Sequence, residues 1–454
     1  MLPRRPAFIF LILVLFSPGC LSIDVTPLRD QGPYLKTKKS LDDVHVLVSQ
    51  DSPSHSLMLG VTRVDITPPV GTPLAGYGSR KGRGSTGIHD RLYARAVALS
   101  DGDQTVILLA NDLLAITDDI RTAVYQKINR EISLKPDSIM ISASHTHSGP
   151  GALAKRFWES FATGPFEQSV FEEITQKMAR AAVEAYQGMK PARLGSGSVQ
   201  VPDLISNRMV VDGPRDPDLS FLVIKTVDPG VTAYVANYSA HPTVLKDNND
   251  LISGDFPGAL ERHLEETPGV IALYTAGSVA DMTANPPEGT DDFEKADKMG
   301  RALANKILEA LPSVVYRDHA RIGSVLATVQ LPSTQVKLGR HRLASSLGNL
   351  FFDRQTVIQA IRVGDSLLLG VPCDLSSEIG LEIKQQARSH GLNAIVVGFA
   401  NDYIGYVIPE KYYYTNAYEA RMSFNGPYMD RYLKEISLEL IKKLISAGRK
   451  GENG

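Results

Sequence analysis

Cysteine is scarce in this sequence, with two residues among 454, Cys20 and Cys373. Because Cys20 belongs to an expected processing site, no internal disulfide is predicted, and the stability of the fold has to come from its core. An excess of positive charge is also missing. The 48 Lys and Arg side chains are balanced by 50 Asp and Glu side chains, and no basic stretch is interleaved with aromatic residues. The charge balance therefore speaks against nucleic acid as a partner.

Internal repeats and low-complexity blocks are absent as well, so one domain of catalytic size is expected at residues 58–446. The polar segment before it, residues 21–57, carries prolines and no sustained period, which predicts a tether; residues 447–454 form a tail. Within the domain, β-rich runs alternate with helical patterns, which predicts an α/β fold. The expected strands are residues 60–66, 94–99, 105–110, 137–141, 220–227, 232–238, 270–275, 321–330, 355–363, 366–371 and 394–399, and the expected helices are residues 117–131, 166–186, 257–266, 292–311, one after Leu375 and a last one from about Tyr428.

The opening residues have the layout of an export signal. Arg4 and Arg5 precede an apolar run over residues 7–16, which is too short for a comfortable membrane span, and Cys20 follows small residues. Residues 1–20 are therefore predicted to be a signal with a lipobox, with a lipid on Cys20 that attaches the protein to a membrane surface in the cell envelope. Ser17 stands where a lipobox more often has leucine. A plain cleaved signal and an uncleaved anchor are the alternatives, and each still exports the chain.

The central stretch of the sequence is residues 142–151, Ser-Ala-Ser-His-Thr-His-Ser-Gly-Pro-Gly. His145 and His147 follow the strand expected at residues 137–141, and a spacing of two along an extended chain places both imidazoles on one face. Two neutral imidazoles held by a rigid strand suit Zn²⁺, and the following Gly-Pro-Gly lets the backbone pass close to a bound group. The alternative is a turn with two ordinary histidines. Histidine is rare here, ten in 454 residues, which favours the metal site.

Other candidate ligands also follow expected strands. His241 comes directly after residues 232–238, and Asp374 follows the strand at residues 366–371, in the run Gly-Val-Pro-Cys-Asp. Ligands of open α/β sheets bind at the carboxyl ends of strands, so these side chains are expected to converge. Taken singly, His241 also fits a hydrogen-bonded structural histidine and Asp374 a helix cap.

Several of these runs, in order from about Leu59 to the last helix, resemble the catalytic domain of the neutral ceramidases, secreted or membrane-associated zinc amidases that cleave N-acylsphingosine. The resemblance implies a layered α/β domain with a mixed β-sheet and flanking helices. The run at residues 144–151 is the most specific, and the others are weaker but collinear. The similar runs are residues 60–67, 86–96, 144–151, 400–406 and 418–419, followed by Gly426-Pro.

The resemblance implies a zinc ion held by His145, His241, Asp374 and Tyr406. The family has glutamate where this chain has Asp374, and the shorter carboxylate still ligates zinc with a small shift of the metal. Further site residues are implied beside these ligands. They are His89, Arg208 and Tyr418, which match family residues around the scissile amide, and His147, which supports the ligands from outside the coordination sphere.

Two departures from the family concern its chemistry. A serine with an assigned catalytic role is replaced by Ala280, and the neighbouring Asp281 is the remaining candidate for a base. The sequence also lacks the family's carboxyl-terminal β-sandwich, and the segment over residues 286–355 is shorter. These departures put long-chain ceramide in doubt as a substrate, more than zinc-dependent hydrolysis itself.

The expected function is that of a zinc-dependent hydrolase which cleaves the amide of an N-acyl lipid or a related compound by attack of zinc-bound hydroxide. Arg208 and a nearby tyrosine would steady the developing oxyanion. Two alternatives remain. One is a barrel-type metal amidohydrolase, which the irregular order of strands disfavours. The other is a non-catalytic lipid-binding or surface interaction lipoprotein on the same fold. Metal content and amide turnover distinguish the catalytic from the non-catalytic protein.

Overall fold

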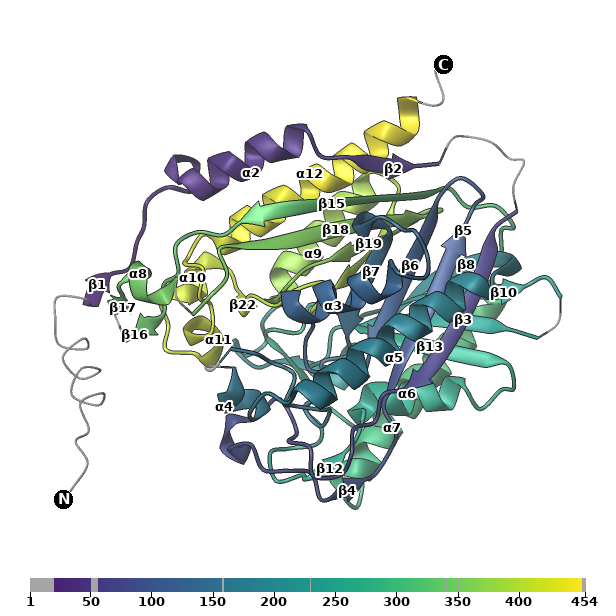
Figure 1. Cartoon of the computed structure of the whole chain (residues 1–454), viewed down its shortest axis with the longest axis horizontal. Helices are drawn as coiled ribbons and strands as arrows, with labels where there is room; N and C mark the ends of the chain where they lie inside the picture. The colour runs from purple at the N-terminus through teal and green to yellow at the C-terminus, as the bar shows by residue number, and fades with distance from the viewer. Residues whose placement is uncertain are drawn as a thin grey trace.

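Two β-sheets lie face to face in the computed structural model, which describes residues 20–49, 56–156, 159–228, 230–339, 341–349 and 351–450 (Figure 1). The larger sheet has the strand order β13-β11-β10-β8-β3-β5-β6-β7, and the smaller has the order β2-β15-β18-β19-β21. Their strands are β2 (Val46–Val48), β3 (Met58–Asp65), β5 (Tyr93–Ser100), β6 (Thr105–Asn111), β7 (Ile139–Ala143), β8 (Lys190–Gln200), β10 (Asp218–Thr226), β11 (Thr232–Tyr238), β13 (Val270–Ala276), β15 (Ile322–Gln330), β18 (Gln355–Val363), β19 (Ser366–Gly370) and β21 (Asn393–Val397).

Six strands of the larger sheet are buried over most of both faces, namely β5, β6, β7, β10, β11 and β13. In β5, Ala96 and Ala98 belong to the core beneath the helices, whereas Val97 and Leu99 belong to the core between the two sheets. Because successive side chains of a strand point to opposite faces, one apolar run serves both cores. This explains why these strands appear in the sequence as nearly continuous apolar segments.

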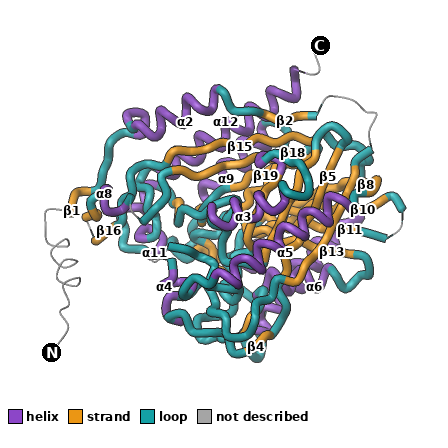
Figure 2. Tube along the Cα trace, viewed as in Figure 1, coloured by secondary structure: helices purple, strands orange, loops and turns teal. Residues whose placement is uncertain are grey.

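Helices cover the two outer faces, so the layers run helix, sheet, sheet, helix. The larger sheet is covered by α3 (Asp118–Ile128), α5 (Gln168–Gln187), α6 (Asp255–Leu264) and α7 (Asp292–Ala310), and the smaller by α2 (Gly32–Asp42), α9 (Ser377–Ser389) and α12 (Met429–Lys450) (Figure 2). The predicted α/β fold with a mixed sheet and flanking helices is confirmed. The second stacked sheet is an addition to it, and this arrangement is not the strand-helix barrel considered as an alternative.

The remaining elements are short and connect the layers. They are β1 (Cys20–Ser22), β4 (Gly87–Ile88), β9 (Ile205–Asn207), β12 (Leu251–Ile252), β14 (Met282–Ala284), β16 (Lys337–Leu338), β17 (His341–Leu343), β20 (Asp374–Leu375), β22 (Tyr406–Val407), α4 (Ser160–Thr163), α8 (Ser345–Gly348), α10 (Glu410–Tyr413), α11 (Tyr418–Arg421), and the 3-10 turns η1 (Leu28–Asp30), η2 (Gly78–Arg80), η3 (Pro136–Ser138), η4 (Pro202–Leu204) and η5 (Leu311–Ser313). None of the described helices is both long enough and apolar enough to cross a membrane.

The prediction of a tether at residues 21–57 is wrong, because this segment contains α2 and β2. In α2, Tyr34, Thr37 and Leu41 are buried at a helical spacing, and β2 is the edge strand beside β15. The buried stripe of α2 is narrow and the rest of the helix is polar, so the sequence gives little periodic signal. The predicted tail begins four residues too early, since α12 continues to Lys450. Of the predicted signal segment, residues 1–19 lie outside the described residues.

The two edges of the larger sheet approach each other, and this brings distant strand ends together. Strand β13 at one edge contacts β7 at the other. The segment after β21 joins both: the N–H of Gly398 donates to the carbonyl of Ala276 at 2.9 Å, and the N–H of Asn401 donates to that of Ile141 at 2.7 Å. Residues that follow β7, β11 and β19 therefore meet in one place.

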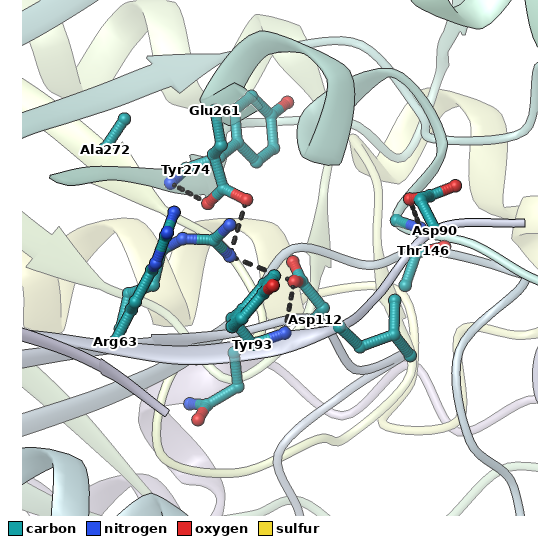
Figure 3. A network of polar contacts seen from close by, with 12 residues as sticks. Arg63, Asp90, Tyr93, Asp112, Thr146, Glu261, Ala272 and Tyr274 are labelled. Atoms are coloured by element: carbon teal, nitrogen blue, oxygen red, sulfur yellow. Dashed lines mark hydrogen bonds and ion pairs between the residues drawn. The ribbon is translucent and has the colours of Figure 1, made fainter. Parts of the chain in front are cut away.

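A buried ion network ties the larger sheet to α6 (Figure 3). The guanidinium of Arg95 lies 3.0 Å from Asp112, 2.7 Å from Glu261 and 3.4 Å from Glu265. Burial raises the pKa of Glu261 well above its usual value, and the charge of Arg95 opposes that rise. Removing Arg95 would leave uncompensated buried carboxylates, at a cost of about 3–5 kcal/mol.

Candidate metal centre and active-site pocket

Three buried histidines meet where β7 and β11 end. The Nε2 atom of His145 lies 3.0 Å from Nε2 of His241, and Nε2 of His147 lies 3.2 Å from each of them. Burial lowers the pKa of His145 to about 3 and lowers the pKa values of the other two well below their usual value. The three imidazoles are therefore neutral and able to bind a metal. The predicted convergence of the candidate histidines is confirmed.

The reason for this convergence differs from the one predicted. Strand β7 ends at Ala143, and His145 has a left-handed backbone with φ of 66°, so the chain is not extended between the two histidines. The turn is held by the N–H of His145, which donates to the carbonyl of Leu113 at 2.9 Å, and by the Thr146 hydroxyl, which donates to the carbonyl of Ser253 at 2.9 Å. A strained turn, rather than strand alternation, aims both imidazoles at one point.

The glycines after this turn allow close packing of the protein's own backbone. A Cβ atom on Gly151 would lie 2.0 Å from the carbonyl oxygen of Thr163, and one on Gly149 would lie 3.0 Å from that of Asp112. The backbone of Gly-Pro-Gly therefore lies close to neighbouring loops, where the sequence predicted a close approach to a bound group.

Hydrogen bonds fix which nitrogen of His145 and of His241 carries the proton. Nδ1 of His145 donates to the carbonyl of Leu114 at 2.6 Å, and Nδ1 of His241 donates to that of Val279 at 3.3 Å. Each ring then presents the lone pair of Nε2 to the other, which is unfavourable unless a cation or a proton donor lies between them. Nδ1 of His147 has no such partner among the described residues.

Asp374 and Tyr406 lie beside the imidazoles and are joined to each other by backbone pairing. They are partners in the two-residue parallel ladder of β20 and β22. One carboxylate oxygen of Asp374, Oδ1, lies 3.7 Å from Nε2 of His145 and lacks a hydrogen-bond partner among the described groups, whereas Oδ2 accepts a hydrogen bond from Tyr403. Burial raises the pKa of Asp374 to about 7, and the bond from Tyr403 opposes that rise.

This donor set fits a single zinc ion. Zinc binds imidazole nitrogen at about 2.0–2.1 Å, so two nitrogens of a tetrahedral site lie about 3.3 Å apart. The observed separation of 3.0 Å between Nε2 of His145 and Nε2 of His241 is close to that value. Facing lone pairs and a buried carboxylate oxygen without a donor are both satisfied by a cation at their centre.

Arg208 is fixed beside Tyr406. Its guanidinium donates to the Tyr406 hydroxyl at 3.2 Å and to the carbonyl of Ala280 at 2.7 Å, and it pairs with Glu419 at 2.8 Å. Burial acts to lower the pKa of Arg208, but Tyr406 and Glu419 outweigh it and raise the pKa, so the side chain stays charged. Glu419 was not identified from the sequence, because nothing in the run Tyr418-Glu indicates that its carboxylate turns inward.

Two predicted site residues lie elsewhere. The ring of His89 stacks on Phe293 with centroids 3.9 Å apart and bonds Asp90 at 2.9 Å, outside the imidazole cluster and the pocket lining. Asp281 accepts hydrogen bonds from Asn207, Ser376 and Ser377. These donors hold Asp281 between the loop that carries Arg208 and the start of α9, which favours a bracing role over that of a base.

An apolar pocket leads to the histidine cluster. It encloses about 850 Å³ that no protein atom fills, including its open mouth. Glu159 is the one acidic residue in its lining, and burial raises the pKa of Glu159 to about 7 against the opposing charge of Arg156. The lining includes Ala75, Leu113, Leu114, Ile120, Leu153 and Met422, together with His145, His147, Tyr403, Tyr406 and Tyr418.

Several known proteins are similar to this chain in sequence. Neutral ceramidase from Pseudomonas aeruginosa is 21% identical over 476 residues, which cover 84% of this chain and 71% of that protein. Neutral ceramidase A from Dictyostelium discoideum is 25% identical over 53% of this chain, and neutral ceramidase from Mycobacterium tuberculosis is 26% identical over 49%. The chain spans only 37% and 40% of the length of these two relatives.

Solved structures share the fold over most of the chain. The crystal structure of neutral ceramidase from Pseudomonas aeruginosa matches 86% of this chain and 74% of its own, with a TM-score of 0.75 at 20% identity. A ceramidase complexed with C2 matches with a TM-score of 0.77 at 19% identity. The family model described as neutral/alkaline non-lysosomal ceramidase, N-terminal, matches residues 57–294, more than half of the sequence. The chain belongs to the neutral/alkaline non-lysosomal ceramidase family.

Proposed function

We propose that this protein hydrolyses the amide bond of an N-acyl lipid at a zinc ion held beneath the apolar pocket. The observation that carries the proposal is the set of buried, facing Nε2 atoms at the inner end of that pocket. Such a site places an apolar chain and a metal next to each other, as lipid amide hydrolysis requires. Relatives named as neutral ceramidases support the class of substrate, and the family alone does not fix the acyl chain or the amine.

The proposed zinc ligands are His145, His241, Asp374 and Tyr406. Both histidines have Nδ1 engaged by a carbonyl oxygen, which orients the Nε2 lone pair toward the ion, and Asp374 offers the free oxygen Oδ1. A zinc ion at this position would lower the pKa of a water molecule and polarise a carbonyl group. His147 lies equally close to the two imidazoles, but its Nδ1 has no partner that fixes its tautomer.

The roles of the other residues follow from their contacts. Arg208 keeps its charge and is held by Glu419, so it can stabilise negative charge on the carbonyl oxygen of the amide. His147 and Tyr418 line the pocket and position the amide above the ligands. The apolar lining excludes water from the alkyl chain, which favours N-acyl compounds over peptides.

Attack by water, rather than by a serine, is the proposed route. Ala280 is fully buried and offers only its carbonyl, which accepts from Arg208. The Ser278 hydroxyl does not replace the missing serine, because it lies against α9, within 2.0 Å of the position that a Cβ on Gly380 would take. The absence of a serine hydroxyl at position 280 also favours a second candidate function. In it, the pocket binds a lipid and no bond is cleaved.

One experiment tests the proposal. The zinc-loaded full chain is incubated with a panel of N-acyl lipids and simpler amides, and the released amine is measured. We expect turnover of at least one N-acyl compound, and its loss in Arg208→Lys, which keeps the charge but not the forked geometry. Stoichiometric zinc with no turnover of any compound, but saturable binding of an N-acyl lipid, would favour the second function.

For localisation, we propose export with a lipid on Cys20, from the arrangement of basic, apolar and small residues in residues 1–20. The Cys20→Ala protein should then leave the membrane fraction and appear in the soluble part of the envelope. Recovery of the natural chain from the cytoplasm would contradict this assignment.

A further inference from the structure

Exposed aromatic side chains gather at one edge of the molecule. In the described part of the chain the exposed aromatic residues are Phe161 at 65%, Tyr414 and Tyr418 at 51% each, and Phe351 at 47%. They lie on or beside α4, α8, α10 and α11, which share one side of the molecule with β1 in Figure 1. Val25, 53% exposed, follows β1 on the same side. We call these five residues the aromatic edge.

Direct contacts connect the parts of this edge. Strand β1 pairs with β17, so that Cys20 is opposite Leu343. The preceding strand of that hairpin, β16, begins at Lys337, whose ammonium donates to the carbonyl of Thr415 at 3.0 Å, next to Tyr414. The hydroxyl of Tyr428 donates to the carbonyl of Val25 at 3.4 Å. The first described residues are therefore attached to the α10–α11 region.

The pocket opens at the same edge. Tyr418 both lines the pocket and is half-exposed to solvent, and Met422 lines the pocket one turn further along the chain. Ala162 and Thr163 of α4, which directly follow Phe161, also line the pocket. Two of the segments that line the pocket therefore carry exposed aromatic side chains.

The chain brings an apolar segment to this edge as well. The apolar run at residues 7–16 precedes β1 in the sequence, and Cys20 is the first residue of β1. Whether the membrane attachment is that run or a lipid on Cys20, it joins the domain at β1. The segment from β1 onward is not a free tether, because β1 is hydrogen-bonded to β17.

We propose that the aromatic edge docks on a lipid bilayer, so that the pocket opens directly toward membrane lipids. Aromatic rings with an apolar body and a polar tip are favoured at the boundary between lipid and water, and exposed apolar patches of this kind mark interaction sites. A bilayer fits better than a second copy of the chain, because the attachment point, the exposed rings and the pocket mouth share this edge. This docking goes beyond the hydrolysis proposed above, and binding to a bilayer does not require that the protein cleaves an amide.

A tryptophan placed on the aromatic edge reports contact with lipid. In the reporter chain the single natural tryptophan is removed as Trp158→Phe, and Phe161→Trp places one tryptophan at a position whose natural side chain is 65% exposed. The full reporter chain is bound to vesicles of phosphatidylcholine and phosphatidylglycerol with brominated acyl chains, which quench tryptophan only at close range. We expect strong quenching in the reporter chain. Absence of quenching in reporter chain that co-floats with the vesicles would overturn the proposal.

Variants separate docking from simple attachment. Tyr414→Asp lies outside the pocket lining and far from the reporter in sequence, and it should leave the chain on the vesicles while quenching falls severalfold. The matched control is Val315→Asp, at a valine that is 71% exposed between η5 and β15, and it should behave as the reporter chain. An equal loss of quenching in both variants would reject the aromatic edge as the contact surface. Circular dichroism confirms that both variants fold.

A turnover measurement gives an independent result. If the proposed hydrolysis holds, Tyr414→Asp should lower turnover of an N-acyl lipid embedded in vesicles by about tenfold and leave a water-soluble short-chain amide unchanged. If no amide is turned over, the quenching result still decides the docking proposal. Sedimentation could instead show a dimer that Tyr414→Asp dissociates. If vesicles also fail to quench the tryptophan, the edge is assigned to a second copy of the chain and bilayer docking is overturned.

Discussion

The imidazole of His145 stacks on the ring of Phe399, with centroids 3.7 Å apart and 9° between the ring planes. Both residues have left-handed backbones, with φ of 66° and 52°. Such conformations cost about 1 kcal/mol each for residues other than glycine, so the surrounding contacts must hold them. Phe399 follows β21 of the smaller sheet and His145 follows β7 of the larger, so this stack fixes one proposed metal ligand across the two sheets.

His145→Gln should abolish zinc binding, because it removes a nitrogen whose lone pair is fixed toward the ion. Elemental analysis of the purified protein should give about one zinc per natural chain and none in the variant. The matched control is His263→Gln, since His263 of α6 bonds Glu266, which follows that helix, and Asp297 of α7. Equal zinc content in all three proteins would contradict the assigned centre.

His147→Gln should keep the zinc and lose activity. Its ring lines the pocket and no hydrogen bond fixes Nδ1, so we assign it to the substrate side of the centre. Removing a supporting residue of this kind costs roughly 10–100-fold in activity. The same zinc analysis combined with kcat/KM tests this, and loss of zinc would instead make His147 a ligand.

Gly76→Ala should misplace His147. At Gly76 the backbone φ is 104°, and an added Cβ would lie 2.5 Å from Nδ1 of His147. A displacement of about 1 Å in an active site lowers kcat by about 100-fold. Gly71→Ala is the control, because Gly71 has a φ of 103° and an added Cβ would have no atom within 4 Å.

Both glycine variants carry the same backbone strain and should lose similar stability, about 1 kcal/mol in the free energy of unfolding. Only Gly76→Ala should lose activity. Thermal unfolding and kcat/KM on one amide substrate measure the two effects, and parallel loss of activity in both variants would show that strain alone is responsible.

Ala280→Ser should not be required for turnover. If water attacks the amide, natural chain and variant should have kcat values within about threefold, a difference below 1 kcal/mol. Burst kinetics report any covalent intermediate in the variant. Activity found only in Ala280→Ser would overturn attack by water and leave lipid binding as the function of the natural chain.

The affinity of the pocket for apolar chains should fall as pH rises. Burial raises the pKa of Glu159 from its ordinary value to about 7, so the carboxyl is neutral below pH 7 and becomes charged above it. A bound alkyl chain removes more water from Glu159 and raises this pKa further. Each additional unit corresponds to a tenfold loss of affinity, about 1.36 kcal/mol, once the pH exceeds the pKa of the complex.

Calorimetry with a non-hydrolysable alkyl ligand at pH 6 and pH 9 measures this dependence. Glu159→Gln should bind equally at both pH values. Thr117, another polar residue of the pocket lining, provides the control Thr117→Val, which should retain the pH dependence of the natural chain. A pH dependence that persists in Glu159→Gln would assign it to another group.

Local sequence pattern was enough to place the candidate residues after strands. The apolar strands β7, β11 and β19 end where polar residues begin, so His145, His241 and Asp374 were predicted at strand ends and are found there. Arg208 entered through the family resemblance alone, and the structure joins it to Tyr406 by a hydrogen bond.

Long-range packing was beyond the sequence. The periodicity of β5 cannot tell whether its second face meets helices or another sheet, so the stacking of two sheets was not foreseen. The left-handed turn at His145 and the inward position of Glu419 depend on contacts with residues more than 25 positions away in the chain, through Leu113 and Arg208. Asp281 was misjudged for the same reason, since its donors come from two other segments.

Helix α2 lies on α12, and this contact between helices far apart in the sequence has a consequence for how the protein folds. The rings of Tyr34 and Tyr432 are tilted by 57° with centroids 5.5 Å apart, and Lys38 pairs with Glu435 at 3.2 Å. These partners are separated by about 400 residues, so the outer helix layer of the smaller sheet closes only after α12 has been made. If the chain is exported as proposed, α2 would cross the membrane undocked, and folding would finish on the far side.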